Sequence, residues 1–373
     1  MREYLVVFGI ALAVTYLLAS VARQSAHSLG AVAKVRDRDV HAVPMPYFGG
    51  PAMLVGLIAA FVVATQLPFL SRAGTTVFDD ARAVLIGGAI ICAVGIIDDV
   101  FELDALSKLA GQVFAGVVVV AMGVQFIYLP LPGTYFGLDQ IQAMILTVFV
   151  IVATVNAVNF VDGLDGLAAG IVGIGAIAFF LYAFVLAVEN GESRAMSSAL
   201  LTAGLAGACL GILPHNFFPA KMFIGDSGSM LIGFVLACSA ISLTGQFPAT
   251  SMSEGIGGAD ASFLAAYLPL ILPFAILLIP FLDMVLAVVR RTRAGQSPWA
   301  PDKMHLHHRL LEIGHSHRRA VLLMYASAAL VAFGVVIVSL FSGWQLVVVF
   351  GVLAALTAAA MLLLPRIEER VWK

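Results

Sequence analysis

Eleven apolar stretches, each about long enough to cross a membrane as a helix, divide this chain and constrain its fold more than any other feature. With 61% hydrophobic and only 11% charged residues, the chain does not have the composition of a soluble globular protein. The pattern also lacks the short alternating strands of a transmembrane barrel. It therefore predicts an all-α, polytopic membrane protein that forms a single transmembrane domain over residues 1–373. The expected spans cover approximately residues 4–20, 50–67, 81–97, 108–124, 141–155, 167–188, 197–213, 228–243, 263–289, 320–341 and 344–364.

Basic residues indicate how these spans are oriented. The first stretch is preceded only by Arg2 and followed by four basic residues between positions 23 and 38, which favours a membrane anchor over a cleaved signal peptide. Eleven spans with the N-terminus outside place 16 of the 20 Lys and Arg residues on the cytoplasmic side. The C-terminus is then cytoplasmic. The ninth stretch contains Pro269, Pro273 and Pro280, so we expect it to be kinked or broken.

The cysteines and the net charge exclude several kinds of site. Cys92, Cys209 and Cys238 all lie within apolar stretches, at no spacing typical of metal ligands or of a disulfide framework. A formal net charge of -2 does not indicate a nucleic-acid partner.

An acidic cluster follows the third apolar stretch. Asp98, Asp99 and Glu102 lie in the segment DDVFE, and Lys108 begins the next stretch. If the segment is helical, Asp98 and Glu102 share one face at a spacing of four residues. Neighbouring carboxylates repel, so a cation is expected beside them, and their hard oxygens suit Mg²⁺ bound together with substrate phosphates. A solvated acidic loop is the alternative.

A second polar cluster, NAVNFVDGLDG at 156–166, separates the fifth and sixth stretches. Ionisable side chains at a membrane boundary are costly and indicate a functional site. Asp162 and Asp165 stand three residues apart where the sixth span is expected to begin, a position typical of helix-capping aspartates. Capping accounts for one aspartate but not for a second one together with Asn156 and Asn159.

Two further cytoplasmic segments carry polar residues. Asp226 precedes the eighth span, where free backbone N–H groups favour an anion such as a diphosphate, with a simple helix cap as the alternative. His305, His307 and His308 lie in the longest basic loop. No cysteine accompanies them, and the surrounding cations disfavour zinc, so we expect a phosphate contact. Attraction of the arginines to anionic lipids is the alternative for those charges.

These clusters share one side of the predicted topology. Carboxylates for Mg²⁺, a helix N-terminus and basic loops together favour phosphoryl transfer from a nucleotide substrate. A multi-span transporter also tolerates membrane carboxylates, but it is expected to hold them near the bilayer midplane. The active site is expected to form from the cytoplasmic loops 21–49, 98–107, 156–166, 214–227 and 290–319.

Four segments resemble the signature blocks of the polyprenyl-phosphate N-acetylhexosamine-1-phosphate transferases. The blocks are DDVFE at 98–102, NAVNFVDGLDG at 156–166, NFFPAKMFIGDSGS at 216–229 and PDKMHLHHRLL at 301–311. The HLHH spelling before Arg309 is more similar to the WecA/TagO-like branch, which uses UDP-N-acetylglucosamine (UDP-GlcNAc). The phospho-MurNAc-pentapeptide transferases usually carry three consecutive histidines and remain the alternative. The third acidic position of the DDxxD pattern is Glu102 here.

The resemblance implies a Mg²⁺-dependent enzyme, with Mn²⁺ as a second option, that transfers GlcNAc-1-phosphate from UDP-GlcNAc to a polyprenyl phosphate. It implies a bacterial plasma-membrane location with a cytoplasmic active site. The product would serve a cell-envelope glycan such as lipopolysaccharide, arabinogalactan or a teichoic acid linkage. The oligomeric state, with a homodimer as one option, and a covalent aspartyl intermediate both stay open.

With this resemblance as a guide, we hypothesise a role for each matched residue. Asn159, Asp162 and Asp165 would hold the nucleotide or the metal shell, and the roles of Asp98 and Asp99 could be exchanged. Asp98 would orient or deprotonate the lipid phosphate, Lys108 would contact it, and Asn216 would lie on the uridine side. The histidines would contact the diphosphate. The expected set is catalytic Asp98, Asp99, Asp162 and Asp165, metal-binding Asp99 and Asp226, and substrate-binding Lys108, Asn159, Asn216, His305, His307, His308 and Arg309.

Overall fold

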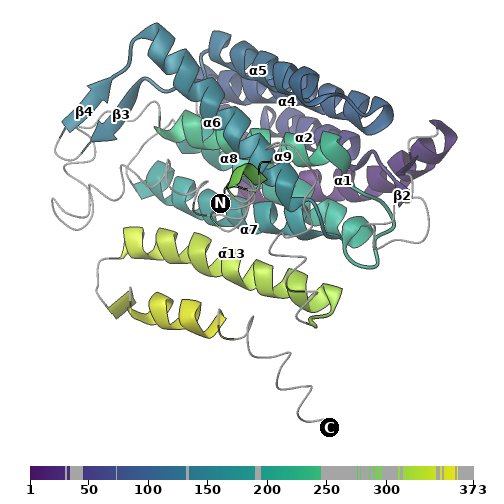
Figure 1. Ribbon diagram of the computed structural model, residues 1–373. Coiled ribbons are helices and arrows are strands. Elements are labelled where there is room, and N and C mark those ends of the chain that lie inside the picture. The colour runs from purple at the N-terminus through teal and green to yellow at the C-terminus, as the bar shows by residue number, and fades with distance from the viewer. Residues whose placement is uncertain are drawn as a thin grey trace.

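The computed structural model describes residues 1–29, 32–33, 45–72, 74–131, 134–189, 195–244, 275, 278, 285, 289, 291–293, 295, 310, 314–341, 345–346, 348–357 and 359. Helices dominate these ranges (Figure 1). The helices are α1 (Arg2–Leu29), α2 (Gly49–Ala64), α3 (Pro68–Ser71), α4 (Thr75–Phe101), α5 (Ala105–Ala121), α6 (Gln140–Val161), α7 (Leu167–Glu189), α8 (Ala195–Asn216), α9 (Gly225–Thr244) and α13 (His317–Leu340). The strands are β1 (Val32–Ala33), β2 (Met45–Pro46), β3 (Tyr128–Leu131) and β4 (Thr134–Gly137).

The prediction of an all-α polytopic membrane protein is confirmed. Seven described helices are long and apolar enough to cross a membrane, and the shorter α2 and α5 coincide with the second and fourth predicted stretches. The ninth stretch falls almost entirely outside the described residues, and the eleventh is described mainly over Val348–Thr357. The count of eleven spans and their orientation therefore stay predictions.

Helix α9 forms the centre of the described bundle. Its apolar segment is completely buried, and the helix packs against α2, α4, α6, α7 and α8. Helix α8, the next most buried, packs against α1 and α7 as well, while α13 lies along α7 at the edge of the bundle (Figure 1). A central helix that contacts most of the others can bring residues from distant parts of the sequence to its N-terminus.

Glycines allow the helix backbones to approach closely. Gly207 and Gly211 form a small-xxx-small pair on α8, and a Cβ atom at Gly207 would collide with the carbonyl oxygen of Phe8 on α1. At the start of α9, a Cβ at Gly95 or at Gly50 would collide with the backbone of Ser227. Helices α2, α4 and α9 therefore meet at the first turn of α9.

Two small antiparallel hairpins, β1–β2 and β3–β4, interrupt the helical pattern. These short strands were not predicted, and they leave the all-α class unchanged. Each strand of β3–β4 has four residues, too few for an alternating pattern to stand out from a loop.

Several helices extend beyond the apolar stretches that predicted them, and two of these extensions contain or border the polar clusters. Helix α4 begins at Thr75 and ends at Phe101, and α6 continues to Val161, so Asn156 and Asn159 are helical and do not lie in a loop. Hydropathy marks the part of a helix that can contact lipid, whereas polar residues can continue the helix past that boundary.

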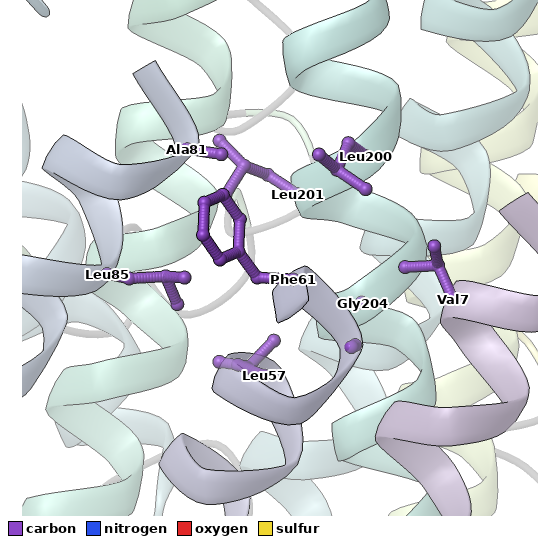
Figure 2. A pocket seen from close by; sticks show the side chains of 9 residues that line it. Val7, Leu57, Phe61, Ala81, Leu85, Leu200, Leu201 and Gly204 are labelled. Carbon is purple, nitrogen blue, oxygen red and sulfur yellow. The ribbon is translucent and has the colours of Figure 1, made fainter. Parts of the chain in front are cut away.

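An apolar pocket lies between α1, α2, α4 and α8 (Figure 2). Val7, Leu57, Phe61, Leu85 and Leu200 are among its lining residues. All its lining side chains are apolar, so the pocket offers no group that would bind a phosphate or a nucleotide.

Candidate active site

The site is built around the junction of α4 with α9. Asp99, near the C-terminal end of α4, accepts the backbone N–H of Asp226 at Oδ1 (2.7 Å) and that of Ser227 at Oδ2 (3.2 Å). A carboxylate from another helix thus caps the N-terminus of α9 and complements its dipole. The sequence predicted free N–H groups for a substrate anion here, but Asp99 already takes these two.

Gly225 makes this cap possible. Its φ of +70° lies in the left-handed region, and a Cβ atom there would lie 2.5 Å from Oδ2 of Asp99. Glycine is therefore required both by the turn into α9 and by the carboxylate that closes it.

Lys108, in the first turn of α5, forms ion pairs with two carboxylates. Its Nζ lies 2.8 Å from Oδ2 of Asp98 and 2.5 Å from Oδ2 of Asp226. Oδ1 of Asp98 accepts the backbone N–H of Leu103 (2.8 Å), which fixes the carboxylate against the turn after α4. Asp98 is 8% exposed, so its negative charge needs this lysine nearby.

Asn159 on α6 completes the contacts of Asp226. Its Nδ2 donates to Oδ1 of Asp226 (2.5 Å) and to Oγ of Ser229 (2.9 Å), while its Oδ1 lies 3.5 Å from Nζ of Lys108. The structure thus brings together Asp98, Asp99, Lys108, Asn159 and Asp226, all of which the sequence singled out, from four helices.

The turn from α6 to α7 is supported by backbone contacts. Asp162 occupies the C-terminal cap of α6, and Oδ2 of Asp165 accepts the backbone N–H of Ala220 (3.1 Å). Asn216 is buried, with its Oδ1 accepting the N–H of Gly166 (3.1 Å) and its Nδ2 donating to the carbonyl of Met222 (3.1 Å). The spacing of Asp162 and Asp165 predicted that they cap the start of α7, but neither of these contacts does so. Asn216 connects the α6–α7 turn to the loop before α9.

Asp162 lies at the edge of this carboxylate group. Enclosure by protein atoms raises the pKa of its carboxyl well above the ordinary value, and the negative charges of Asp226, Asp99 and Asp165 raise it further. A cation or a bound proton would relieve that repulsion.

Glu102 does not lie on a helical face with Asp98. Helix α4 ends at Phe101, and Glu102 adopts a left-handed conformation with φ of +53° and an exposed side chain. The expected spacing fails because the helix ends one residue earlier. Asp104 then caps α5 by accepting the N–H groups of Leu106 and Ser107, each at 3.1 Å.

His305, His307, His308 and Arg309 lie outside the described residues. Within the described ranges, no group of three or more His, Cys, Asp or Glu side chains is arranged to hold a metal ion by itself. A divalent cation at the α4–α9 junction would therefore take further oxygens from substrate or water, which is the usual way Mg²⁺ binds.

Ser229 and Gln112 also contact the site residues, although neither was predicted from the sequence. Ser229 lies in the block GDSGS and accepts a hydrogen bond from Asn159. Gln112 follows Lys108 by one helical turn, and this spacing is the signal that could have identified it.

The sequence of this chain is similar to those of several known proteins. A profile for the family described as "Glycosyl transferase family 4" matches residues 81–244, which contain Asp98 through Asp226. The chain is 46% identical to decaprenyl-phosphate N-acetylglucosaminephosphotransferase of Mycolicibacterium smegmatis, over 99% of this chain and 90% of that protein. It is 45% identical to the protein of the same name from Mycobacterium tuberculosis, over 90% and 82% of the two chains. It is also 31% identical to a probable undecaprenyl-phosphate N-acetylglucosaminyl 1-phosphate transferase of Bacillus subtilis, over 87% and 82%.

Proposed function

Because this chain belongs to the family 4 glycosyl transferases, among the polyprenyl-phosphate GlcNAc-1-phosphate transferases, we propose that it transfers GlcNAc-1-phosphate from UDP-GlcNAc to a polyprenyl phosphate. The observation that carries the proposal is the cluster of Asp98, Asp99 and Asp226 around Lys108 at the end of a membrane bundle. Such a cluster lies where a lipid phosphate and a water-soluble nucleotide can meet.

The reaction is a phosphoryl transfer. An oxygen of the lipid phosphate attacks the sugar-linked phosphorus of UDP-GlcNAc, and the bond from that phosphorus to the bridging oxygen breaks. UMP leaves with the bridging oxygen, and the product is polyprenyl-diphosphate-GlcNAc. A phosphate monoester with a second pKa of roughly 6 is largely ionised at neutral pH, so a strong general base is not essential. Charge neutralisation and positioning supply most of the catalysis.

The geometry supports a role for each residue of the cluster. Lys108 holds its ammonium group between Asp98 and Asp226, from where it can contact the lipid phosphate. Asp98, fixed by Leu103, orients that phosphate or accepts its last proton. Asn159 aligns Asp226, and Asp162 and Asp165 form the neighbouring wall on the nucleotide side.

Mg²⁺ fits the donor set of the junction, with Mn²⁺ as a second option. Asp99 and Asp226 offer hard carboxylate oxygens from two helices, and the cluster of three aspartates and one lysine keeps an excess of negative charge. When bound, the ion would neutralise the diphosphate and polarise its phosphorus–oxygen bonds.

We also place the enzyme in the bacterial plasma membrane with this cluster facing the cytoplasm, where UDP-sugars are available. Two of the relatives are named for decaprenyl phosphate, and the one from Bacillus subtilis is named as a probable transferase for undecaprenyl phosphate. The reaction would be the first membrane step in the synthesis of a cell-envelope glycan.

The decisive experiment is a transfer assay with purified protein, Mg²⁺ and radiolabelled UDP-GlcNAc. Decaprenyl and undecaprenyl phosphate are supplied in separate reactions, and UDP-MurNAc-pentapeptide replaces UDP-GlcNAc in a parallel reaction. We expect label in the lipid fraction and one UMP per labelled lipid, with UDP-GlcNAc as the preferred donor. Preference for the pentapeptide donor would contradict the proposal. So would uptake of UDP-GlcNAc into protein-containing vesicles without UMP release.

A further inference from the structure

A second polar layer lies one helical turn deeper in the bundle than the carboxylate cluster. Gln112 on α5 and Asn156 on α6 face each other as a pair of amides. Nδ2 of Asn156 donates to Oε1 of Gln112 (2.6 Å) and to the carbonyl oxygen of Val152 (2.8 Å). Nε2 of Gln112 donates to Oδ1 of Asn156 (3.4 Å) and to Sδ of Met230 (3.4 Å). Both N–H groups of each amide therefore have an acceptor.

The spacing relates this layer to the carboxylate cluster. Gln112 follows Lys108 by four residues on α5, and Met230 follows Asp226 by four residues on α9. Asn156 precedes Asn159 by three residues on α6. Residues three or four apart share one face of a helix, so the two layers are stacked on the same three helices.

The surroundings make the amide pair specific for one arrangement of these helices. Gln112 and Met230 are fully buried, and the neighbouring residues of α5, α6 and α9 are mostly apolar. Rotation or sliding of α5 against α6 would leave up to three amide N–H groups without acceptors in an apolar environment, which is costly, whereas the bond from Asn156 to Val152 lies within α6 and would remain. A polar pair of this kind can therefore fix the register of two helices.

We propose that Gln112 and Asn156 are positioning residues for the transfer reaction. Their amide pair fixes α5 against α6, and this register lets Lys108 and Asn159 contact Asp226 at the same time. The inference rests on the proposed function of the cluster. Neither residue reaches the carboxylates itself, so each acts through Lys108 and Asn159.

The main test is Gln112→Met, which keeps the length of the side chain but removes the amide. We expect kcat for GlcNAc-1-phosphate transfer to fall by about 10- to 100-fold, because a displacement of about 1 Å in a positioned group has effects of that size. The KM for UDP-GlcNAc should change much less. The matched control is Ser198→Ala, which removes another buried interhelical hydrogen bond, from Ser198 Oγ to the carbonyl of Ser239 (2.8 Å), away from the cluster. It should leave kcat unchanged.

A double-mutant cycle separates positioning from general destabilisation. In an Asn159→Ala background, one of the two groups that the pair positions is absent, so Gln112→Met should lower kcat by a smaller factor than it does in the wild type. If the losses of kcat caused by Asn159→Ala and by Gln112→Met multiply in full in the double variant, the proposal is overturned. An equal fall in kcat for Ser198→Ala and Gln112→Met would also overturn it.

The exchanged pair, Gln112→Asn with Asn156→Gln, keeps the combined length of the two amides and provides a second test if Gln112→Met does not fold. Its kcat should exceed that of either single variant, and a kcat no higher than theirs would overturn the proposal. Wild-type protein without transfer activity would refute the proposed function itself. An active wild type with a fully active Gln112→Met variant would refute only the positioning role.

Discussion

Asp226 joins four helices of the described site through its side chain and its backbone. It accepts from Lys108 and Asn159, and its own backbone N–H donates to Asp99. Its carboxylate therefore links α5, α6 and α9, while its backbone links α4. A carboxylate with this many partners is held in one orientation, which is what electrostatic preorganisation requires.

Asp226→Asn should lower kcat by about 100-fold or more, because the charge that faces Lys108 and a bound cation is lost while the shape is kept. The measurement is UMP release in the presence of Mg²⁺. Asp79→Asn is the matched control, since Asp79 is an exposed residue at the opposite end of α4 whose ion pair with Arg82 (3.5 Å) is also exposed. Exposed pairs contribute little, so this variant should retain full activity. Near-normal turnover by Asp226→Asn would remove Asp226 from the metal site.

Gly225→Ala tests the cap that Asp99 forms on α9. The new methyl group would collide with the Asp99 carboxylate and would strain a left-handed residue, at a cost of about 1–2 kcal/mol for the backbone alone. Gly123 has a positive φ of +100° but no atom within 4 Å of an added Cβ. Gly123→Ala therefore reproduces the strain without the collision. We expect both variants to lower the apparent Tm and only Gly225→Ala to lower kcat, and equal activity in the two would argue against the Asp99 cap.

At this scale, the sequence identified the charged residues but not their partners. Asp98, Asp99, Lys108 and Asp226 were predicted from their segments, because charged groups beside apolar spans stand out. Nothing in the local sequence indicates that Asp99 caps a helix whose N-terminus is 127 residues away. That contact depends on the packing of α4 against α9. Because Asp99 takes the two N–H groups at the start of α9, they are not free for a substrate anion, as the sequence had predicted.

At the scale of elements, α13 braces the loops next to the site. The hydroxyl of Tyr325 donates to the carbonyl of Gly166 (2.5 Å), and its ring fills the space left by Gly170 on α7. The ring of His317 stacks on Phe218 with centroids 4.5 Å apart, and Nε of Arg318 donates to the carbonyl of Phe218 (3.3 Å). The helix thus supports both the α6–α7 turn and the loop before α9.

Tyr325→Phe should lower stability by about 1 kcal/mol, the usual net contribution of one intramolecular hydrogen bond. The hydroxyl of Tyr4 supplies the matched control, because it is buried and has no hydrogen-bond partner among the described residues. Tyr4→Phe should leave the apparent Tm unchanged or raise it. Thermal unfolding in detergent, followed by intrinsic fluorescence, distinguishes the two. An equal loss in both variants would show that the bond to Gly166 does not stabilise the turn.

The elements themselves were predicted more completely than their ends. Nine apolar stretches coincide with described helices, because hydropathy over about twenty residues is a strong signal. The ends of α4 and α6, the exposed Glu102 and the β3–β4 hairpin were not predicted. Helix ends depend on caps such as the Asp139–Gln142 capping box of α6 and on contacts with other helices, which local hydropathy does not contain.

At the scale of the whole molecule, the described bundle carries its charged cluster at one end only of α4 and α9. The carboxylate cluster occupies the end where α4 finishes and α9 begins, whereas the loop between α2 and α4 lies at the opposite ends of those helices. The predicted orientation puts the first end in the cytoplasm, because 16 of the 20 Lys and Arg residues fall on that side. This uneven distribution of basic residues concerns the orientation of the whole chain in the membrane. The orientation is therefore best tested in intact cells.

Single cysteines provide that test. Ser71 and Ala105 are both exposed, Ser71 after α2 and Ala105 beside the carboxylate cluster. In intact cells, a membrane-impermeant maleimide should label Ser71→Cys and not Ala105→Cys, and permeabilised cells should show labelling of both. The native Cys92, Cys209 and Cys238 are buried, so the unmodified protein serves as the low-background control. Labelling of Ala105→Cys from outside would reverse the orientation and would place the site away from the cytoplasmic pool of UDP-sugars, which the proposed reaction requires.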